Sequence, residues 1–394
     1  MGAVSEPLTG IRVVDFSRAL AGPFCAQMLG DMGADVVKIE ARQGGDDSRG
    51  WGPPFMGQES TYFFAMNRNK RSMTLDLKKG KDIAERLLAR ADVVVENFSP
   101  GTMARLGLGY EQVKAYNSRV VYCSISGYGQ TGPGSSLPGY DMTAQGASGL
   151  MSVTGHDQPT RMGVSIADQV AGMFGAFAVV SALYSRRDTG QGQFIETSLL
   201  GGMVATLMHH ASAYLNAGKV AGLQGNTHAT IAPYETLPTK DGFINVGVAN
   251  DRLWQRFCEA MELQTLLADE RFSSNADRVR NRTVLAELIT ERFGNFTTAD
   301  LVSRLTGAGI PADAIKNVAE VFEDPRVLHL GLKLGMEHST CGHIEMAGMP
   351  YLLSGTPATA RLAPPALGQH TSEVLLELGC SQAEIERFRA EGIV

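Results

Sequence analysis

The chain has 394 residues, of which 44% are hydrophobic and 19% are charged, as in ordinary soluble globular proteins. This length suits two or three domains with large cores. The formal net charge is -6 and no Lys/Arg-rich tail is present, which argues against a nucleic-acid-binding protein.

Five scattered cysteines form no CxxC pair, which predicts reduced thiols rather than a zinc site or a disulfide framework. They are Cys25, Cys123, Cys258, Cys341 and Cys380. The apolar stretch 170–184 is short for a bilayer span, so we expect a buried core helix there. Residues 1–6 lack the features of a signal peptide or a myristoylation motif, so the expected location is the cytoplasm, without a membrane partner.

The first half of the chain alternates strand-like and helix-like segments. Apolar, β-branched runs predict strands at 11–16, 34–39, 92–96 and 119–125. Helical patterns lie between them at 24–32 and 81–91. This alternation predicts an α/β fold, with a Rossmann-like parallel sheet covered by helices on both faces. No GxGxxG motif follows the first strand, so dinucleotide binding finds no support.

The pattern changes between residues 225 and 325. The turn signal Asp241-Gly242 precedes a predicted strand at 243–248. Predicted helices follow at 251–261, 282–293 and 298–308. We therefore expect a large domain over 1–200, a linker over 201–224, a small α+β domain over 225–325 and a C-terminal part over 326–394. That last part contains a candidate strand at 342–346 and a helix near 372–378.

Asp168 lies directly before a long apolar helical pattern that starts at Gln169. The simplest interpretation is a helix N-cap, whose carboxylate accepts backbone N–H bonds and meets the positive end of the helix. A carboxylate held in this way stays ionised and fixed in direction, as a nucleophile must be. A structural and a catalytic role are therefore both open for Asp168.

Eight short segments occur in a characteristic order along the chain. They are 8–23 (LTGIRVVDFSRALAGP), 33–40 (GADVVKIE), 67–72 (NRNKRS), 96–101 (ENFSPG), 126–133 (SGYGQTGP), 189–193 (TGQGQ), 225–234 (GNTHATIAPY) and 367–372 (LGQHTS). In this order they resemble the class III CoA-transferase family of formyl-CoA transferases, carnitine CoA-transferases and 2-methylacyl-CoA racemases. Segments 45–55, 59–62 and 327–331, the last with the following 336–338, resemble its succinyl-CoA:glutarate (or hydroxymethylglutarate) CoA-transferase branch.

The resemblance implies an enzyme that moves CoA from an acyl-CoA, succinyl-CoA in that branch, to a small carboxylic acid such as glutarate. Asp168 would carry CoA as a covalent aspartyl thioester, which divides one difficult exchange into two easier steps. CoA is itself transferred, so no metal and no permanently bound cofactor is implied. The C-terminal part would return to the large domain. Two chains would interlock as a homodimer, with the active site between the large domain of one chain and the small domain of the other.

The resemblance also assigns CoA contacts. They are Leu75 beside the adenine, with Lys78, Asn97, Phe98 and Arg105. For Lys78 and Arg105 a solvated surface charge is the alternative. Many relatives carry Arg directly after Ile-Glu of the second strand, where this chain has Ala41, and this counts against a phosphate contact from Arg42.

A dicarboxylic acceptor needs a group that binds its distal carboxylate, and Arg does this in bidentate fashion. The candidates are Arg18 and Arg49, followed by Tyr62, Tyr140 and His228. An ion pair with Asp46 or Asp47 is the alternative for Arg49. The loop 225–230 resembles the family segment over the catalytic aspartate but lacks its run of glycines, and a domain linker is its alternative.

Two other functions remain open. A 2-methylacyl-CoA racemase needs a second acid/base group, and Tyr140 stands where racemases of the family carry His. A phenol with a pKa near ~10 is a poor base at neutral pH. His156 lies in a turn and is expected at the surface. A noncatalytic acyl-CoA-binding protein is the other alternative, against which the presence of Asp168 counts.

Overall fold

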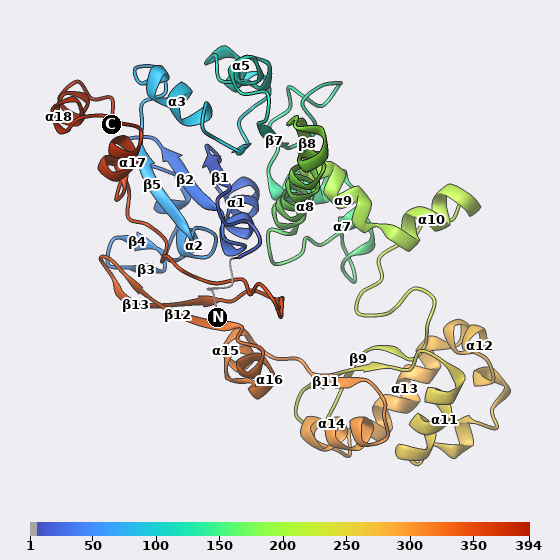
Figure 1. The fold of residues 1–394 in the computed structure, drawn as a ribbon. Coiled ribbons are helices and arrows are strands. Elements are labelled where there is room, and N and C mark those ends of the chain that lie inside the picture. The colour runs from blue at the N-terminus through green and yellow to red at the C-terminus, as the bar shows by residue number, and fades with distance from the viewer. Residues whose placement is uncertain (1–5) are drawn as a thin grey trace. The chain divides into compact units, whose positions relative to one another are not determined.

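The computed structural model describes residues 6–394; residues 1–5, on which the expected location partly rests, lie outside the described part. The chain divides into two compact units (Figure 1). The larger unit combines the described residues up to Leu150 with Arg161–Val220 and Pro325–Val394. The smaller unit consists of Met151–Thr160 and Ala221–Asp324. The N-terminal and C-terminal parts of the chain therefore belong to one unit.

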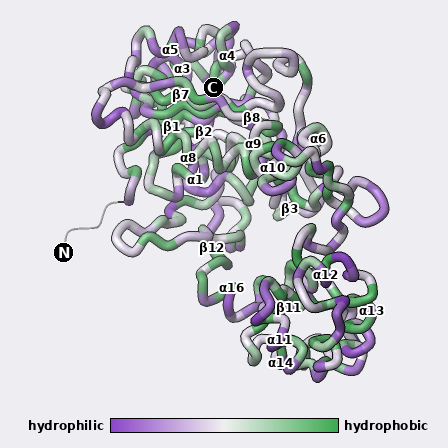
Figure 2. The backbone as a smooth tube through the Cα atoms, turned by 90° about the vertical axis from the view of Figure 1, so that its right-hand side faces the viewer, coloured by the Kyte–Doolittle hydropathy of each residue, from purple (hydrophilic) through white to green (hydrophobic). Residues whose placement is uncertain are grey.

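A six-stranded sheet forms the centre of the larger unit. In spatial order its strands are β5 (Lys70–Thr74), β2 (Asp35–Glu40), β1 (Arg12–Asp15), β6 (Val93–Glu96), β7 (Val121–Ser126) and β8 (Phe194–Ser198). All neighbouring pairs are parallel. This order is that of the Rossmann fold, and it reverses between β1 and β6. The buried core residues of β1, β2 and β7 are mainly hydrophobic (Figure 2), because helices cover both faces of the sheet.

One face of the sheet is covered by α1 (Ala21–Asp31) and α8 (Ile166–Thr189), which enclose an apolar core. The two helices approach closely at Gly172, where an added Cβ would lie 2.6 Å from the carbonyl oxygen of Ala21. α8 has 24 residues, so the sequence-based length of 170–184 is too short. By length and composition α8 could cross a membrane, but half of its apolar window is buried inside the fold.

The opposite face carries α3 (Lys81–Leu88), α5 (Tyr110–Tyr116), α17 (Thr371–Glu377) and α18 (Gln382–Ala390). Val374 and Phe388 of the C-terminal helices share an apolar core with Ile83 of α3. Arg71 of β5 forms ion pairs with Glu373 (2.7 Å) and Glu377 (2.8 Å). The C-terminal segment therefore completes the core of the larger unit.

Shorter elements connect this framework. They are η1 (Asp47–Gly50), β3 (Phe55–Met56), β4 (Glu59–Ser60), α2 (Thr61–Phe64), α4 (Thr102–Arg105), α6 (Asp141–Ala147), α7 (Leu150–Val153), α9 (Leu199–Thr206), α10 (Met208–Ala217) and α16 (Pro325–His329). A hairpin of β12 (Lys333–His338) and β13 (Gly342–Ala347) packs Ile344 and Met346 against Phe63 and Phe64 of α2.

The smaller unit has its own sheet and core. Strands β9 (Tyr234–Pro238), β10 (Phe243–Gly247) and β11 (Ala312–Ala314) form an antiparallel sheet with β10 in the centre. The helices are α11 (Asp251–Ala260), α12 (Asn275–Arg280), α13 (Arg282–Phe293), α14 (Thr298–Gly307) and α15 (Val318–Glu323). α11, α13 and α14 end within one residue of the predicted helices. Their side chains, including Trp254, Phe257 and Phe293, form a separate apolar core.

Candidate active site

A cavity of about 770 Å³ lies beyond the carboxyl ends of β1, β2, β5 and β6. It is placed where the strand order reverses, which is where open parallel sheets bind their ligands. Leu75, Lys78 and Phe98, three of the five residues assigned to CoA, line this cavity together with Arg18. The lining combines apolar side chains with three cations, Arg18, Arg42 and Lys78, which suits a nucleotide that carries phosphates.

Arg18 is therefore grouped with the CoA candidates rather than beside Asp168. Its guanidinium lies 5.2 Å from the centre of the Phe98 ring, within the range of a cation–π contact. Asn97 does not line the cavity but holds Arg18 in place. Its Oδ1 accepts a hydrogen bond from the Arg18 backbone N–H, and its Nδ2 donates to the Arg18 carbonyl, both at 2.8 Å.

Two further arginines near this cavity have other contacts. Arg105 is exposed on α4, and its guanidinium donates to the Thr102 hydroxyl at 2.8 Å. Arg42 lines the cavity, but its Nε and Nη1 donate to the carbonyl oxygens of Val394 and Gly392 at 3.0 and 3.2 Å. Arg42 Nε and Nη1 are therefore occupied by contacts within the chain, and the expectation of no phosphate contact from Arg42 stays a prediction.

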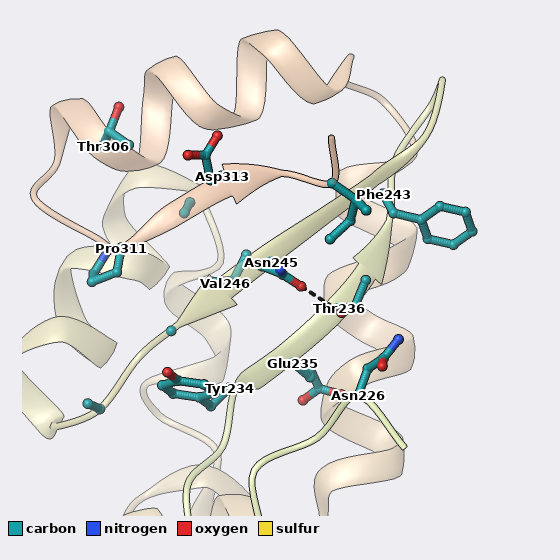
Figure 3. Close-up of a pocket in the computed structure, with 14 residues that line it drawn as sticks. Asn226, Tyr234, Glu235, Thr236, Phe243, Asn245, Val246, Thr306, Pro311 and Asp313 are labelled. Carbon is teal, nitrogen blue, oxygen red and sulfur yellow. Dashed lines mark hydrogen bonds between the residues drawn. The ribbon is translucent and has the colours of Figure 1, made fainter. Parts of the chain in front are cut away.

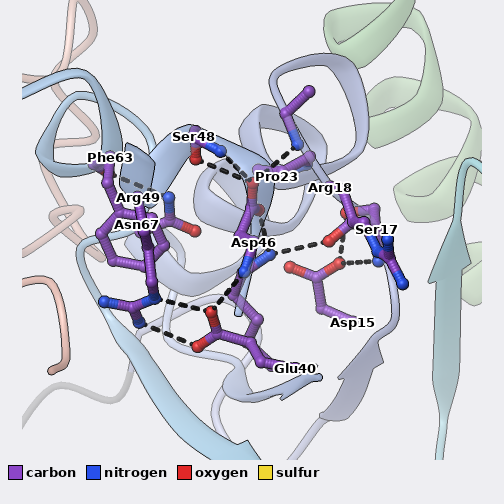
Figure 4. A network of polar contacts seen from close by, with 12 residues as sticks. Asp15, Ser17, Arg18, Pro23, Glu40, Asp46, Ser48, Arg49, Phe63 and Asn67 are labelled. Atoms are coloured by element: carbon purple, nitrogen blue, oxygen red, sulfur yellow. Dashed lines mark hydrogen bonds and ion pairs between the residues drawn. The ribbon is translucent and has the colours of Figure 1, made fainter. Parts of the chain in front are cut away.

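Two buried lysines, Lys38 and Lys70, fix the segment 17–23, which runs from the end of β1 into α1. Figure 4 shows Ser17, Arg18 and Pro23 of this segment together with Asp15 and Asp46. Lys38 Nζ donates to the Ser17 carbonyl at 2.7 Å and pairs with Asp46 at 2.8 Å. Asp46 accepts a hydrogen bond from the Ala19 backbone N–H at 3.0 Å. Burial raises the pKa of Asp46, but the charge of Lys38 outweighs this and lowers the pKa to about 2.

Lys70 holds the other end of the same segment. Its Nζ pairs with Asp15 at 3.0 Å and donates to the Pro23 carbonyl at 2.8 Å. Burial lowers the pKa of Lys70 to about 8, although the charge of Asp15 opposes this shift. The segment that carries Arg18 is thus tied at several backbone atoms.

Asp168 is the third residue of α8. The N-cap position is Ser165, so the predicted N-cap role of Asp168 is wrong. Burial and, secondly, the negative charge of Asp141 raise the pKa of Asp168 to about 7, against a hydrogen bond from the Ala21 backbone N–H that lowers it. The expectation of a firmly ionised carboxylate is therefore also wrong, because burial outweighs the helix end. With a pKa of about 7, the Asp168 carboxylate is more basic than an ordinary aspartate.

Tyr62 of α2 lies close to Asp168. Burial raises the pKa of Tyr62, a hydrogen bond with Ser165 lowers it, and the charges of Asp168 and Asp141 raise it further. Tyr62 and Ser165 line a second, mainly apolar cavity of about 510 Å³. Its other lining residues include Leu20, Phe24, Met28, Val164, Gln169 and Met173. This cavity borders the first turn of α8 and suits the carbon chain of a small acid.

Arg49 is committed to structural contacts. Its Nε and Nη2 bind the carboxylate of Glu40 at 2.7 and 2.8 Å, and its Nη1 lies 3.4 Å from Glu59. The guanidinium also lies 3.7 Å from the centre of the Phe63 ring. In this structure Arg49 forms structural ion pairs, which was the alternative to substrate binding. Its partners are Glu40 and Glu59 rather than the predicted Asp46 and Asp47. The prediction chose Asp46 and Asp47 because they lie close to Arg49 in the sequence. In the folded chain, Glu40 at the end of β2 is the partner of Arg49.

Tyr140 and His228 belong to different units. Tyr140 precedes α6, and its side chain is 71% exposed. His228 belongs to the smaller unit, where its ring centre lies 5.2 Å from that of Tyr234. His156, in the same unit, is exposed as expected.

The smaller unit has its own open cavity of about 1040 Å³ on one face of its sheet (Figure 3). Tyr234, Phe243 and Asp313 lie along it, and Thr236 donates a hydrogen bond to Asn245 at 2.6 Å. None of the predicted site residues lines this cavity. Among residues 6–394, no cluster of three or more His, Cys, Asp or Glu side chains could hold a metal ion.

Sequence reasoning missed the group that acts most directly on Asp168. Asp141 appeared only as part of the tripeptide compared with racemases. No spacing rule links Asp141 to α8, because the contact between them depends on how α6 packs. Lys38 and Asp46 were missed for a similar reason, since charged residues in a strand and a loop are ordinarily expected at the surface.

The larger unit thus has the architecture of α/β proteins that bind nucleotide-bearing ligands, with a parallel sheet, a cavity at its switch point and a carboxyl group of raised pKa on an adjacent helix. The family model of CoA-transferase family III matches residues 8–371. The chain belongs to this family and is a CoA-transferase.

Two enzymes and one solved structure show how similar the relatives are. The human succinyl-CoA:glutarate CoA-transferase is 42% identical over 377 residues, covering 95% of this chain and 86% of that protein. The succinate–glutarate CoA-transferase of Agrobacterium fabrum is 39% identical over 382 residues, covering 94% and 96%. The crystal structure of a CaiB/BaiF family protein from Brucella suis has a TM-score of 0.85 at 39% identity, covering 95% and 100%.

Proposed function

We propose that this enzyme transfers CoA from succinyl-CoA to a small dicarboxylic acid such as glutarate, through an aspartyl-CoA thioester on Asp168. The observation that carries the proposal is the segment 17–21. Arg18 lines the cavity at the switch point, and the backbone N–H of Ala21, three residues later, binds the carboxyl group of Asp168. One short segment thus connects the candidate CoA site with the candidate nucleophile.

The chemistry of each half-reaction follows from this arrangement. The Asp168 carboxylate attacks the thioester carbonyl, forms a mixed anhydride and releases the CoA thiolate. The thiolate then attacks the aspartyl carbonyl, which leaves an aspartyl-CoA thioester and a free carboxylate. The acceptor acid reverses both steps. A carboxylate with a raised pKa is the better nucleophile once ionised, and burial keeps water away from the anhydride.

Backbone donors are available where negative charge develops. The first turn of α1 begins at Ala21, and the N–H groups at a helix start have no partner within the helix. In this proposal the Ala21 N–H, which faces Asp168, stabilises the oxyanion of the aspartyl carbonyl. Tyr62, which borders the apolar cavity beside Asp168, binds the acid substrate through its hydroxyl.

The proposal includes a cytoplasmic homodimer. Met173, Phe177, Val180 and Tyr184 follow each other at spacings of four, three and four residues along α8 and are all exposed in the single chain. Phe177 and Tyr184 are 72% and 70% exposed. An apolar row of this kind is typical of a helix that packs against a second chain. Light scattering is expected to give a dimer mass, whereas a fully active monomer would overturn this part.

The direct test is product analysis by liquid chromatography after mixing the purified enzyme with succinyl-CoA and single dicarboxylic acids. Glutarate is expected to yield glutaryl-CoA and succinate in equal amounts. The same samples in deuterated water, with a 2-methylacyl-CoA added, test for a racemase. Exchange of the α-proton without any CoA transfer would contradict the proposal.

A further inference from the structure

Asp141 binds the beginning of α8 from a neighbouring helix. It is the first residue of α6 and only 8% exposed. Its Oδ1 accepts a hydrogen bond from the Ala167 backbone N–H at 2.8 Å. Its Oδ2 accepts from the amide of the buried Gln145 at 2.8 Å, and Gln145 Oε1 accepts from the Met162 backbone N–H at 2.9 Å. Since the Ser165 side chain does not cap α8, Asp141 supplies this cap from α6.

Asp141 therefore holds a second negative charge next to the residue that precedes Asp168. Asp141 on α6 is the charged group that raises the pKa of Asp168, and Tyr62 on α2 is the other titratable group that interacts with it. α9 also packs on α8 but carries no titratable side chain.

The titratable groups of the other elements packed on α8 have separate partners. On α1, Cys25 interacts with Cys123 of β7, and Asp31 pairs with Arg68. On β7, Tyr122 donates a hydrogen bond to the Leu108 carbonyl. On β8, Glu196 accepts a hydrogen bond from the Gln130 backbone N–H. The like charge of Asp141 is therefore not offset by a positive charge from these elements.

We infer, resting on the proposed function, that Asp141 is a positioning residue whose charge drives Asp168 into the covalent aspartyl-CoA state. Formation of the thioester consumes the Asp168 carboxylate and an acyl-CoA, and it releases the acyl group as a free carboxylate. The negative charge thus leaves position 168 with the product. Acylation removes one of two buried like charges, so the repulsion by Asp141 favours the loaded enzyme over the resting one.

Protonation and acylation neutralise the same carboxylate. The repulsion between Asp141 and the Asp168 carboxylate therefore raises both the pKa of Asp168 and the equilibrium constant for acylation. A rise of one pKa unit corresponds to a tenfold rise in that equilibrium constant. Removal of the Asp141 charge lowers both by the same factor. At a pH above the Asp168 pKa of both wild type and the variant, the full effect on acylation is seen. At a pH below both pKa values the effect disappears, because Asp168 is then already neutral and acylation releases its proton.

The test is the ratio of CoA-loaded to free enzyme, measured by intact-protein mass spectrometry at a fixed ratio of succinyl-CoA to succinate from pH 5 to pH 9. Asp141→Asn removes the charge but keeps an oxygen for the Ala167 N–H. Gln145→Met keeps the charge of Asp141 but removes both hydrogen bonds of Gln145, the one to Asp141 and the one to Met162. For wild type the dependence on pH is expected to change near pH 7, the pKa of Asp168.

In Asp141→Asn the midpoint is expected to fall by about one pH unit and the ratio of CoA-loaded to free enzyme above pH 8 by about tenfold, with no difference from wild type at pH 5. Gln145→Met is expected to keep the wild-type midpoint. An equal loss at every pH with an unchanged midpoint would overturn the inference and leave the proposed function standing. No adduct in wild type would instead defeat the proposed function. If circular dichroism shows that Asp141→Asn is unfolded, Asp141→Ser, a neutral cap, takes its place.

Discussion

The side chain of Asn97 makes hydrogen bonds in both directions to the backbone of Arg18, each at 2.8 Å. Asn97 follows β6 and Arg18 follows β1, so this contact joins the two strands between which the strand order reverses. The hydrogen bonds from Asn97 therefore fix the backbone of the cavity wall from which the Arg18 side chain extends.

Asn97→Ala is expected to raise the KM for succinyl-CoA by about tenfold with a smaller change in kcat, because two hydrogen bonds of about 1 kcal/mol each are lost. Asn117→Ala is the matched control, since Asn117 also donates to two carbonyl groups in this unit, those of Leu88 and Ala91. It is expected to lower thermal stability without changing the KM. Equal KM values for both variants would contradict the positioning role of Asn97.

Lys78→Ala and Arg18→Ala are each expected to weaken succinyl-CoA binding by about tenfold and to reduce its sensitivity to salt, because each removes a cation facing the phosphates. Lys79→Ala is the control, since Lys79 Nζ donates to the Glu391 carbonyl and does not line the cavity. Initial rates are measured with both substrates varied. A rise in the KM for the acid alone would return Arg18 to its predicted role as a carboxylate-binding residue.

Arg49→Met is expected to destabilise the fold by about 3–5 kcal/mol, because it leaves the buried Glu40 without its cation. Urea unfolding followed by circular dichroism measures this change. The double variant Arg49→Met/Glu40→Gln is expected to recover a large part of the loss. Unchanged stability together with a raised KM for glutarate would show that Arg49 binds substrate instead.

Asp168→Asn is expected to make the protein more stable at pH 8 than wild type, by roughly 2–4 kcal/mol, with the difference disappearing near pH 4. The pKa of Asp168 is raised to about 7 in the folded protein, so the folded state binds more protons than the unfolded state between about pH 4 and 7. Wild type therefore loses stability as the pH rises through this range, and the variant does not. Urea unfolding at pH 4, 6 and 8 gives the comparison, and a constant difference would contradict a raised pKa.

Much of the fold was predictable because its strands are apolar and its helices amphipathic. In the central sheet the prediction missed β8, whose sequence is Phe-Ile-Glu-Thr-Ser, and β5, whose sequence is Lys-Arg-Ser-Met-Thr. Strand β5 is held by partners distant in sequence, since Lys70 binds Asp15 and Arg71 binds Asp35 and Glu377. Side-chain pattern alone cannot signal a strand whose charges are neutralised by tertiary contacts.

In the candidate site, too, some features were predictable from the sequence and others were not. Phe98 and Lys78 follow or flank strand ends, so their convergence was implied by a parallel sheet together with the family resemblance. The pKa of Asp168 was not predictable, because it depends on burial and on Asp141, which contacts α8 across 26 residues of sequence. The partner of Arg49 was misassigned for the same reason, since Glu40 comes from a neighbouring strand end.

A hydroxylamine trap tests directly whether a covalent aspartyl intermediate forms on Asp168. Wild type and Asp168→Ala are incubated with succinyl-CoA, quenched with hydroxylamine and digested, and the peptide that contains position 168 is identified by mass spectrometry. Wild type is expected to carry a hydroxamate on Asp168, and the variant is expected to show neither hydroxamate nor CoA transfer. CoA transfer by Asp168→Ala, or a hydroxamate on another residue of wild type, would contradict this intermediate.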